Sequence, residues 1–186
     1  MLDFRHLKPA LDFLFPSMLF SPMRFTMSPS RAYILGLWKG RKTAEGIGVE
    51  GRGELCEIFL KACMDEGFAT ADKVKSTEDE RGSRCYFYNT ALRKWLQDEM
   101  GKREERLRFK NEFAANYFAG VFDSRGGWRD SVKGEVIPYL MGDRIDEIVL
   151  LRLGFRAKKE SGKLAIISED FYGWIMPYLK LMKKPL

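Results

Sequence analysis

The sequence contains little of the chemistry on which many enzymes and exported proteins depend. Its 186 residues include one histidine, His6, and three cysteines, Cys56, Cys63 and Cys85. The cysteines are odd in number, lie within apolar patterns and are far in sequence from the histidine, which argues against a disulfide framework and a zinc site. We therefore expect a reduced, cytoplasmic protein with buried thiols and with no metal or other cofactor.

Long hydrophobic runs are also missing. The apolar stretch from Leu11 to Phe20 is interrupted by Pro16 and lacks a small-residue cleavage site, and no run reaches the length of a membrane span. The sequence thus predicts neither a signal peptide nor a membrane protein. Side-chain amides are scarce, with one glutamine and three asparagines, whereas lysine, arginine and glutamate are abundant. This composition favours a thermophilic, archaeal source.

What the chain does have is enough apolar material for a core, together with an excess of positive charge. Hydrophobic residues make up 45% of the sequence, and the formal net charge is +6. A chain of 186 residues can form one domain or two small fused halves. The basic excess makes a polyanionic partner, such as nucleic acid, a plausible one.

One short motif occurs twice in the chain. Residues 116–126 (NYFAGVFDSRG) align with residues 32–42 (AYILGLWKGRK) when Gly120 is set against Gly36. Small residues recur at every fourth position, which on a helix places them in one flat stripe. These residues are Ala32, Gly36 and Gly40 in the first copy and Asn116, Gly120 and Ser124 in the second. Because such stripes let two helix backbones approach closely, the motif predicts a helix pair at the centre of a pseudo-twofold monomer.

The segments that follow each motif have the same order. In the first half we expect a strand or hairpin at 43–51, a helix at 54–66, a hairpin at 70–89 and a helix from 91 to about 100. In the second half we expect a strand pair at 128–141, a helix at 144–153, a hairpin at 156–167 and a closing helix from 168.

This repeat divides the chain into four parts. They are a non-repeated N-terminal arm at 1–27, a first repeat at 28–100, a charged linker at 101–112 and a second repeat at 113–186. We expect the linker to be helical over residues 101–110.

On these residues the sequence resembles the LAGLIDADG homing endonuclease family, in its single-chain form with two repeats. The segment FAGVFDSRG at 118–126 carries most of the resemblance, and ILGLWKGRK at 34–42 carries it more weakly. The resemblance covers about residues 30 to 180. It implies an α+β fold of two αββαββα units, in which two antiparallel sheets form a saddle over nucleic acid and the motif helices pack at the centre.

The sequence departs from the family where cleavage depends on it. The family has an acid at the penultimate position of each motif, and the two acids hold divalent metals that polarise phosphate and activate water. Here these positions are Arg41 and Arg125, and arginine cannot coordinate a cation. This departure from the family therefore implies a non-catalytic protein without a metal site. Two arginines near helix C-termini favour a phosphate between them; alternatively, each pairs with a carboxylate of Asp123, Glu45 or Asp130.

Other basic and aromatic residues are candidates for contacts with nucleic acid. Lys73 and Lys75 are two positions apart, as are Arg156 and Lys158, so each pair is expected to project from one face of a strand. The complete basic set is Arg41, Lys42, Lys73, Lys75, Arg84, Arg125, Arg129, Arg156, Lys158 and Lys163. The aromatic residues Tyr86, Tyr88 and Trp128 are candidates for stacking on unpaired bases or for packing in the core.

Three functions are compatible with these features. The first is non-catalytic binding of duplex DNA or of structured RNA, including ribosomal RNA in a ribosome-associated protein. The second is a magnesium-dependent DNA endonuclease with the displaced carboxylates Asp123, Asp130 and Glu45. The third is a protein-interaction module whose saddle holds a polypeptide. Affinity for nucleic acid that falls steeply with salt would distinguish the first function from the third.

Overall fold

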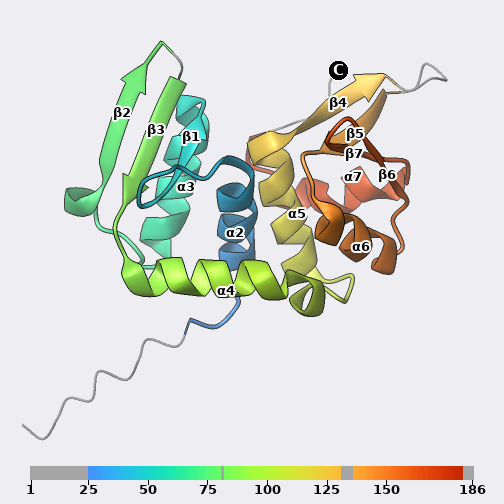
Figure 1. The fold of residues 1–186 in the computed structure, drawn as a ribbon, viewed down its shortest axis with the longest axis horizontal. Helices are drawn as coiled ribbons and strands as arrows, with labels where there is room; N and C mark the ends of the chain where they lie inside the picture. The colour runs from blue at the N-terminus through green and yellow to red at the C-terminus, as the bar shows by residue number, and fades with distance from the viewer. Residues whose placement is uncertain (1–24, 81, 131–135, 182–186) are drawn as a thin grey trace, which may run out of the picture.

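The computed structural model describes residues 25–80, 82–130 and 136–181. These residues form two similar halves, and each half contributes one helix to a central pair (Figure 1). The first half consists of α2 (Pro29–Arg41), β1 (Ile47–Gly51), α3 (Gly53–Asp65), the 3-10 helix η2 (Ala71–Lys73), β2 (Lys75–Asp79), β3 (Gly82–Phe87) and α4 (Thr90–Arg106). The second half consists of α5 (Glu112–Arg125), β4 (Gly126–Asp130), β5 (Val136–Leu140), α6 (Arg144–Arg152), β6 (Ala157–Glu160), β7 (Lys163–Ile166), α7 (Asp170–Ile175) and the 3-10 helix η3 (Met176–Tyr178). Most of the predicted N-terminal arm at 1–27 lies outside the described residues.

The predicted α+β architecture with two antiparallel sheets is confirmed. The first sheet has the strand order β1-β3-β2, and the second has the order β4-β5-β7-β6. The counterpart of β4 in the first half is a single bridge between Lys42 and Val49. The reason is chain length, because only residues 42–46 separate α2 from β1, whereas residues 126–135 separate α5 from β5. The two halves are therefore more similar in their helices than in their sheets.

The two motif helices, α2 and α5, pack directly on each other at the centre of the molecule, as predicted. A Cβ atom added to Gly36 would lie 2.2 Å from the backbone oxygen of Tyr117, and one added to Gly120 would lie 2.3 Å from the backbone oxygen of Tyr33. These distances are shorter than any normal contact, so the helices approach to a separation that excludes a side chain at the crossing.

The stripes of small residues continue on both sides of this crossing. Ala32 is fully buried, and a Cβ atom on Gly40 would meet the Ser124 side chain. Asn116 is also buried, but its amide donates a hydrogen bond of 2.9 Å to the Glu112 carbonyl of its own helix. Large apolar residues flank the stripes, and Trp38 and Phe122 point into the core of their own halves. On each of the two helices, the small residues thus form the face that contacts the other helix, and the large apolar residues form the face that packs in the core.

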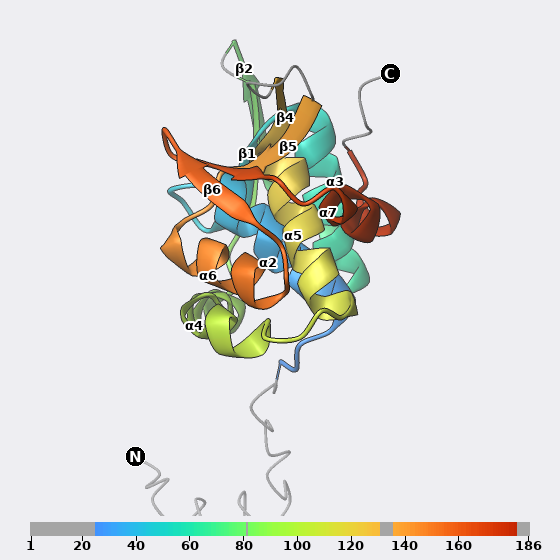
Figure 2. The ribbon, with the colours of Figure 1, turned by 90° about the vertical axis from the view of Figure 1, so that its right-hand side faces the viewer.

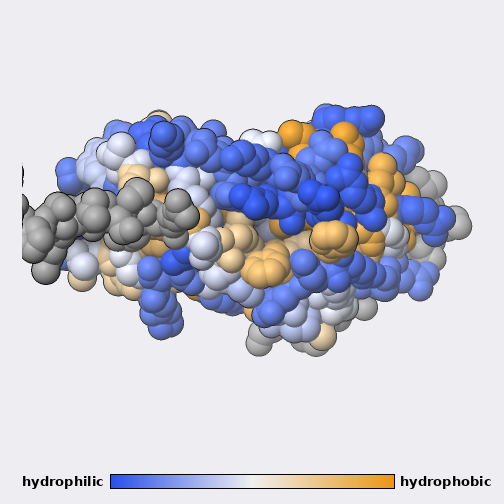
Figure 3. Space-filling model, turned by 90° about the horizontal axis from the view of Figure 1, so that it is seen from below, coloured by the Kyte–Doolittle hydropathy of each residue, from blue (hydrophilic) through white to orange (hydrophobic). Residues whose placement is uncertain are grey.

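The long helix α4 crosses beneath both halves (Figure 1). The sequence predicts a helix to about residue 100 followed by a helical linker, and the structure forms one continuous helix to Arg106. Its outer side is solvent-exposed, and the underside of the molecule is largely hydrophilic (Figure 3). Its inner side contacts α6, which lies above it when the second half faces the viewer (Figure 2).

A buried ionic cluster joins α4 to three other helices. The carboxylate of Asp146, at the start of α6, is 1% exposed and lies 2.5 Å from Lys39 Nζ of α2. It accepts hydrogen bonds from Tyr117 Oη of α5 at 2.8 Å and from Arg103 Nε of α4 at 3.3 Å. The Arg103 guanidinium also contacts Asp143. Burial alone would raise the pKa of Asp143, but Lys39 and Arg103 outweigh it and hold the pKa below its ordinary value.

The three cysteines are buried and free, as the sequence predicts. In the part of the chain that is described, no helix combines the length and hydrophobicity needed to cross a bilayer.

We predict that Gly36→Ala lowers the free energy of unfolding by about 1–3 kcal/mol or more, because the methyl group would push α5 away. Urea denaturation followed by circular dichroism measures this change. The matched control is Gly101→Ala in α4, where an added Cβ meets nothing within 4 Å. That variant should be neutral or more stable by about 0.5–1 kcal/mol. Equal stability of Gly36→Ala and the wild type would contradict the close approach.

Candidate nucleic-acid interface

A pocket of about 320 Å³ lies where the C-terminal ends of α2 and α5 meet the end of β1. Three arginines from separate segments line it, namely Arg41 at the end of α2, Arg52 between β1 and α3, and Arg125 at the end of α5. The other lining residues are Gly51, Leu55, Asp123, Ser124, Gly126, Tyr139 and Met141. We call this feature the arginine pocket.

The arginines of the two motifs are available for a ligand. Arg41 is half-buried and its Nε donates a hydrogen bond to the Ser124 carbonyl at 3.3 Å, whereas Arg125 is exposed. Among the residues that the structure describes, neither arginine forms an ion pair with a carboxylate. The predicted alternative, in which each arginine pairs with Asp123, Glu45 or Asp130, is therefore not found there.

Asp123, the acidic residue in the pocket lining, has a structural role. It is 2% exposed and accepts hydrogen bonds of 2.7 Å from Tyr33 Oη and from the backbone N–H of Lys180. Burial, and then the charge of Asp123, raises the pKa of Tyr33 far above its ordinary value, so the phenol stays protonated and donates. The Lys180 Nζ atom lies 4.6 Å from the centre of the Tyr33 ring. Asp123 thereby joins both motif helices to the C-terminal segment.

The other two displaced carboxylates do not complete a metal site. Glu45 is exposed in the loop before β1, where it raises the pKa of Tyr86, while Asp130 is exposed at the end of β4. Within residues 25–80, 82–130 and 136–181, no three His, Cys, Asp or Glu side chains gather in a way that could hold a metal ion. The donor set of the arginine pocket, three guanidinium groups beside a carboxylate that is already hydrogen-bonded, fits an anion and does not fit a divalent cation.

The outer face of the second sheet is basic. Its strands bury Leu164 and Ile166 on the inner side, so the alternating residues face outward. Four predicted ligand-binding residues lie on this face, namely Arg129, Arg156, Lys158 and Lys163. Glu160 is shared by Arg129 at 2.6 Å and Lys158 at 3.1 Å. Hydrogen bonds from Arg129 and then Lys158 lower the pKa of Glu160. One acid shared between two bases leaves this face with net positive charge.

The outer face of the first sheet has mixed charge. Lys75 and Arg84 are exposed there, and Arg84 is paired in register with Glu50 of β1. Lys42 lies at the edge of this sheet, 5.7 Å from the Trp38 ring centre. The prediction that Lys73 and Lys75 project from one strand is wrong, because β2 begins at Lys75 and Lys73 lies in the 3-10 helix before it.

The predicted aromatic residues have different environments. Trp128 does not face a ligand, because its ring lies 4.6 Å from Tyr172 and 5.8 Å from Phe122, on the inner side of the second sheet. Of its two predicted roles, core packing is therefore the one that the structure shows. Tyr86 and Tyr88 lie on the outer side of the first sheet, and Tyr88 is 62% exposed.

Two residues of the interface were missed by the sequence analysis. Arg52 enters the arginine pocket from outside both motifs, although its position between Gly51 and Gly53, in a turn after a strand, was a usable signal. Tyr139 lines the same pocket from β5, and its ring centre lies 4.3 Å from Lys163 Nζ. It lies in the strand pair predicted at 128–141, and nothing in the sequence indicated that it would line a pocket.

No protein-family model matches the sequence, and comparison with curated proteins gives no significant match. Solved structures do match. A chain from a study of mesophilic variants of the homing endonuclease I-DmoI superposes with a TM-score of 0.56 and 13% identity, covering 81% of this chain and 95% of that one. The chain has the LAGLIDADG endonuclease fold.

Two DNA complexes of I-DmoI give the same result. I-DmoI with its nicked target DNA and manganese has a TM-score of 0.56 and 14% identity, over 81% of this chain and 95% of that one. I-DmoI with DNA and calcium has a TM-score of 0.54 and 15% identity, over 81% and 88%. At such low identity the similarity establishes the fold alone.

We predict that Tyr33→Phe destabilises the protein by about 1.5–3 kcal/mol, because it removes a hydrogen bond to a buried charged carboxylate. Chemical denaturation measures the change. Tyr88→Phe removes a hydroxyl from an exposed ring and should leave the free energy of unfolding unchanged. If Tyr33→Phe were as stable as Tyr88→Phe, Asp123 would not have the structural role assigned to it.

Proposed function

We propose that the protein binds nucleic acid without cleaving it and that the arginine pocket holds a backbone phosphate. The observation that carries this proposal is the convergence of Arg41, Arg52 and Arg125 on one pocket, with no ion pair from either motif arginine to a described carboxylate. I-DmoI, which shares the fold, is described in complex with its target DNA. The same framework here presents guanidinium groups at the centre of the saddle.

The chemistry of the pocket favours phosphate over other partners. A guanidinium group donates two parallel hydrogen bonds to a phosphate. The negative charge of a phosphate held between several guanidinium groups also offsets the repulsion among them. The C-terminal ends of α2 and α5 contribute partial negative charge that supports the arginines in the absence of a ligand. A water molecule in this pocket would find no free carboxylate base in Asp123, which is hydrogen-bonded to Tyr33 and Lys180.

The second sheet extends the contact surface beyond the pocket. Tyr139 belongs to both the pocket lining and this sheet, and Lys163 lies against its ring. The basic residues of the outer face therefore begin next to the phosphate position. A nucleic acid whose backbone enters the arginine pocket would continue along Lys163, Arg129 and Lys158. Duplex DNA and structured RNA, including ribosomal RNA, both provide such a backbone.

We predict that Arg41→Ala combined with Arg125→Ala weakens binding to a DNA duplex or an RNA hairpin by about tenfold or more, because charge-assisted hydrogen bonds to phosphate are lost. The slope of log affinity against log salt should shrink by about 1. Fluorescence anisotropy at several salt concentrations measures both quantities.

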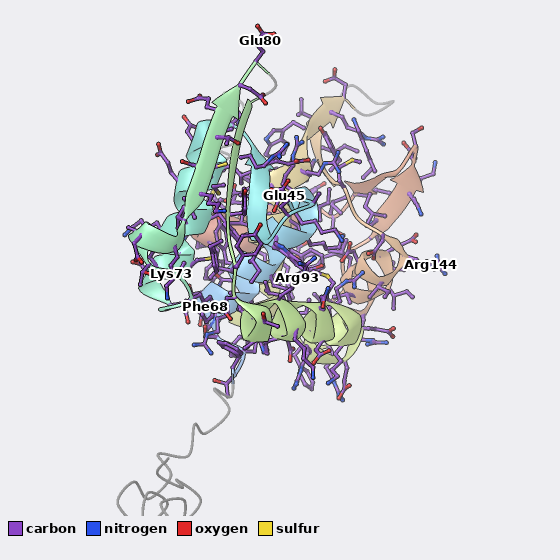
Figure 4. The ribbon with its side chains drawn as sticks, turned by 60° about the vertical axis from the view of Figure 1, so that its left-hand side comes forward. Glu45, Phe68, Lys73, Glu80, Arg93 and Arg144 are labelled. Carbon is purple, nitrogen blue, oxygen red and sulfur yellow. The ribbon has the colours of Figure 1, made fainter. Side chains whose placement is uncertain are left out.

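The matched control removes two arginines of equal charge elsewhere. Arg93 lies on α4 and Arg144 at the start of α6 (Figure 4). Neither residue lines the arginine pocket. Arg93→Ala combined with Arg144→Ala should change affinity little. If both double variants lost affinity equally, the loss would depend only on net charge, and the assignment of a phosphate to the arginine pocket would be overturned.

A cleavage assay tests the non-catalytic part of the proposal. Supercoiled plasmid with magnesium should remain intact with the wild type. Nicking that disappears in Asp123→Asn or Asp130→Asn would instead establish an endonuclease with displaced carboxylates. A wild type without salt-dependent affinity for any nucleic acid would favour the protein-interaction alternative.

A further inference from the structure

The outer face of the first sheet carries a tyrosine pair that phosphate binding does not use. Tyr86 lies across the glycines of the neighbouring strand, since a Cβ atom on Gly48 would be 2.5 Å from Tyr86 Cβ and one on Gly46 would be 3.0 Å from its ring. The nearby carboxylate of Glu45 raises the pKa of its hydroxyl. Tyr86 is thus held in place by its packing against the two glycines.

Tyr88 stands against this fixed ring. The two ring centres are 5.7 Å apart and the rings are inclined at 83°, so an edge of one contacts the face of the other. Lys75 Nζ lies 5.5 Å from the Tyr88 ring centre. Tyr88 nevertheless remains 62% exposed. An exposed aromatic ring that its neighbours already orient loses little conformational freedom when a flat ligand stacks on it.

The charges around Tyr88 limit what that ligand can be. Glu45 and Glu50 are exposed beside the basic residues Lys75 and Arg84. A continuous duplex backbone along this sheet would approach both carboxylates and be repelled. A nucleobase is uncharged and offers a π-face, so it meets no such repulsion. The first sheet therefore suits an unpaired base better than the outside of a duplex.

The corresponding ring in the second sheet is not open in the same way. Tyr139 also lies against a glycine of the neighbouring strand, since a Cβ on Gly127 would be 2.9 Å from its hydroxyl. Its face, however, is covered by Lys163 at 4.3 Å. The two sheets thus share a tyrosine-on-glycine arrangement, but the exposed stacking surface belongs to the first.

We propose that Tyr88, oriented by Tyr86 and Lys75, is a stacking site for an unpaired nucleobase. This inference rests on the proposed function and narrows its ligand to a nucleic acid with both a paired and a single-stranded part. Phe87, which precedes Tyr88, pairs with Ile47 at one end of β1, and Gly51 at the other end lines the arginine pocket. Tyr88 is one residue beyond this pair, so at a rise of about 3.3 Å per residue the two sites are about 17 Å apart along the strand, within reach of one ligand.

The test compares two probes, an RNA hairpin with an unpaired loop and a blunt RNA duplex with the same stem. Tyr88→Ala should weaken hairpin binding by roughly 5- to 150-fold and leave duplex binding unchanged, because one stacked base contributes about 1–3 kcal/mol. Tyr88→Phe should retain hairpin binding, since stacking uses the ring and not the hydroxyl. A DNA hairpin of the same sequence shows whether the site requires ribose.

The matched control is Phe109→Ala. Phe109 is 66% exposed in the turn between α4 and α5, and Arg108 lies 6.0 Å from its ring centre, so it is also an exposed ring beside a cation. Its loss should not affect either probe.

The outcomes separate this inference from the proposed function. Unchanged hairpin binding by Tyr88→Ala, or equal losses for hairpin and duplex, would overturn the stacking site while the arginine pocket stands. A wild type that binds neither probe would overturn the proposed function itself.

Discussion

The backbone contact between α2 and α5 at Gly36 and Gly120 is the constraint on which the rest of the structure depends. Because no side chain separates the helices, their C-terminal ends meet, and Arg41 reaches the carbonyl of Ser124 on the other helix. The same proximity lets Tyr33 of one helix donate to Asp123 of the other. The arginine pocket is therefore a product of helix packing, and its geometry is only as precise as that packing.

A second set of interactions joins the helix pair to α4 and α6. Asp146 receives Lys39, Arg103 and Tyr117 from three helices, and α4 extends this cluster across both halves. A buried carboxylate with three partners is costly to disturb, because removing one partner leaves charge without compensation. The ionic cluster thus joins α2 and α5 to α4 and α6, while Asp123 joins the two helices to each other and to the C-terminal segment.

The sequence predicted what local spacing determines and missed what long-range contact determines. The four-residue period of small side chains specified the helix pair, which the structure confirms. Arg103 lies in the segment predicted as a charged linker, and its buried partner Asp146 is 43 positions away in the sequence. For Trp128, one residue of register decided between the ligand side and the core.

The two halves share a backbone plan but carry different outer surfaces. One sheet presents Arg129, Lys158 and Lys163 around a single shared acid, and the other presents the tyrosine pair among mixed charges. A ligand that spans the molecule would meet chemically distinct ends, so turning it around would place the wrong groups on each sheet. The two halves of the pseudo-twofold fold are therefore not interchangeable for a ligand. A self-complementary, two-fold symmetric target would match them poorly, because its two ends are identical.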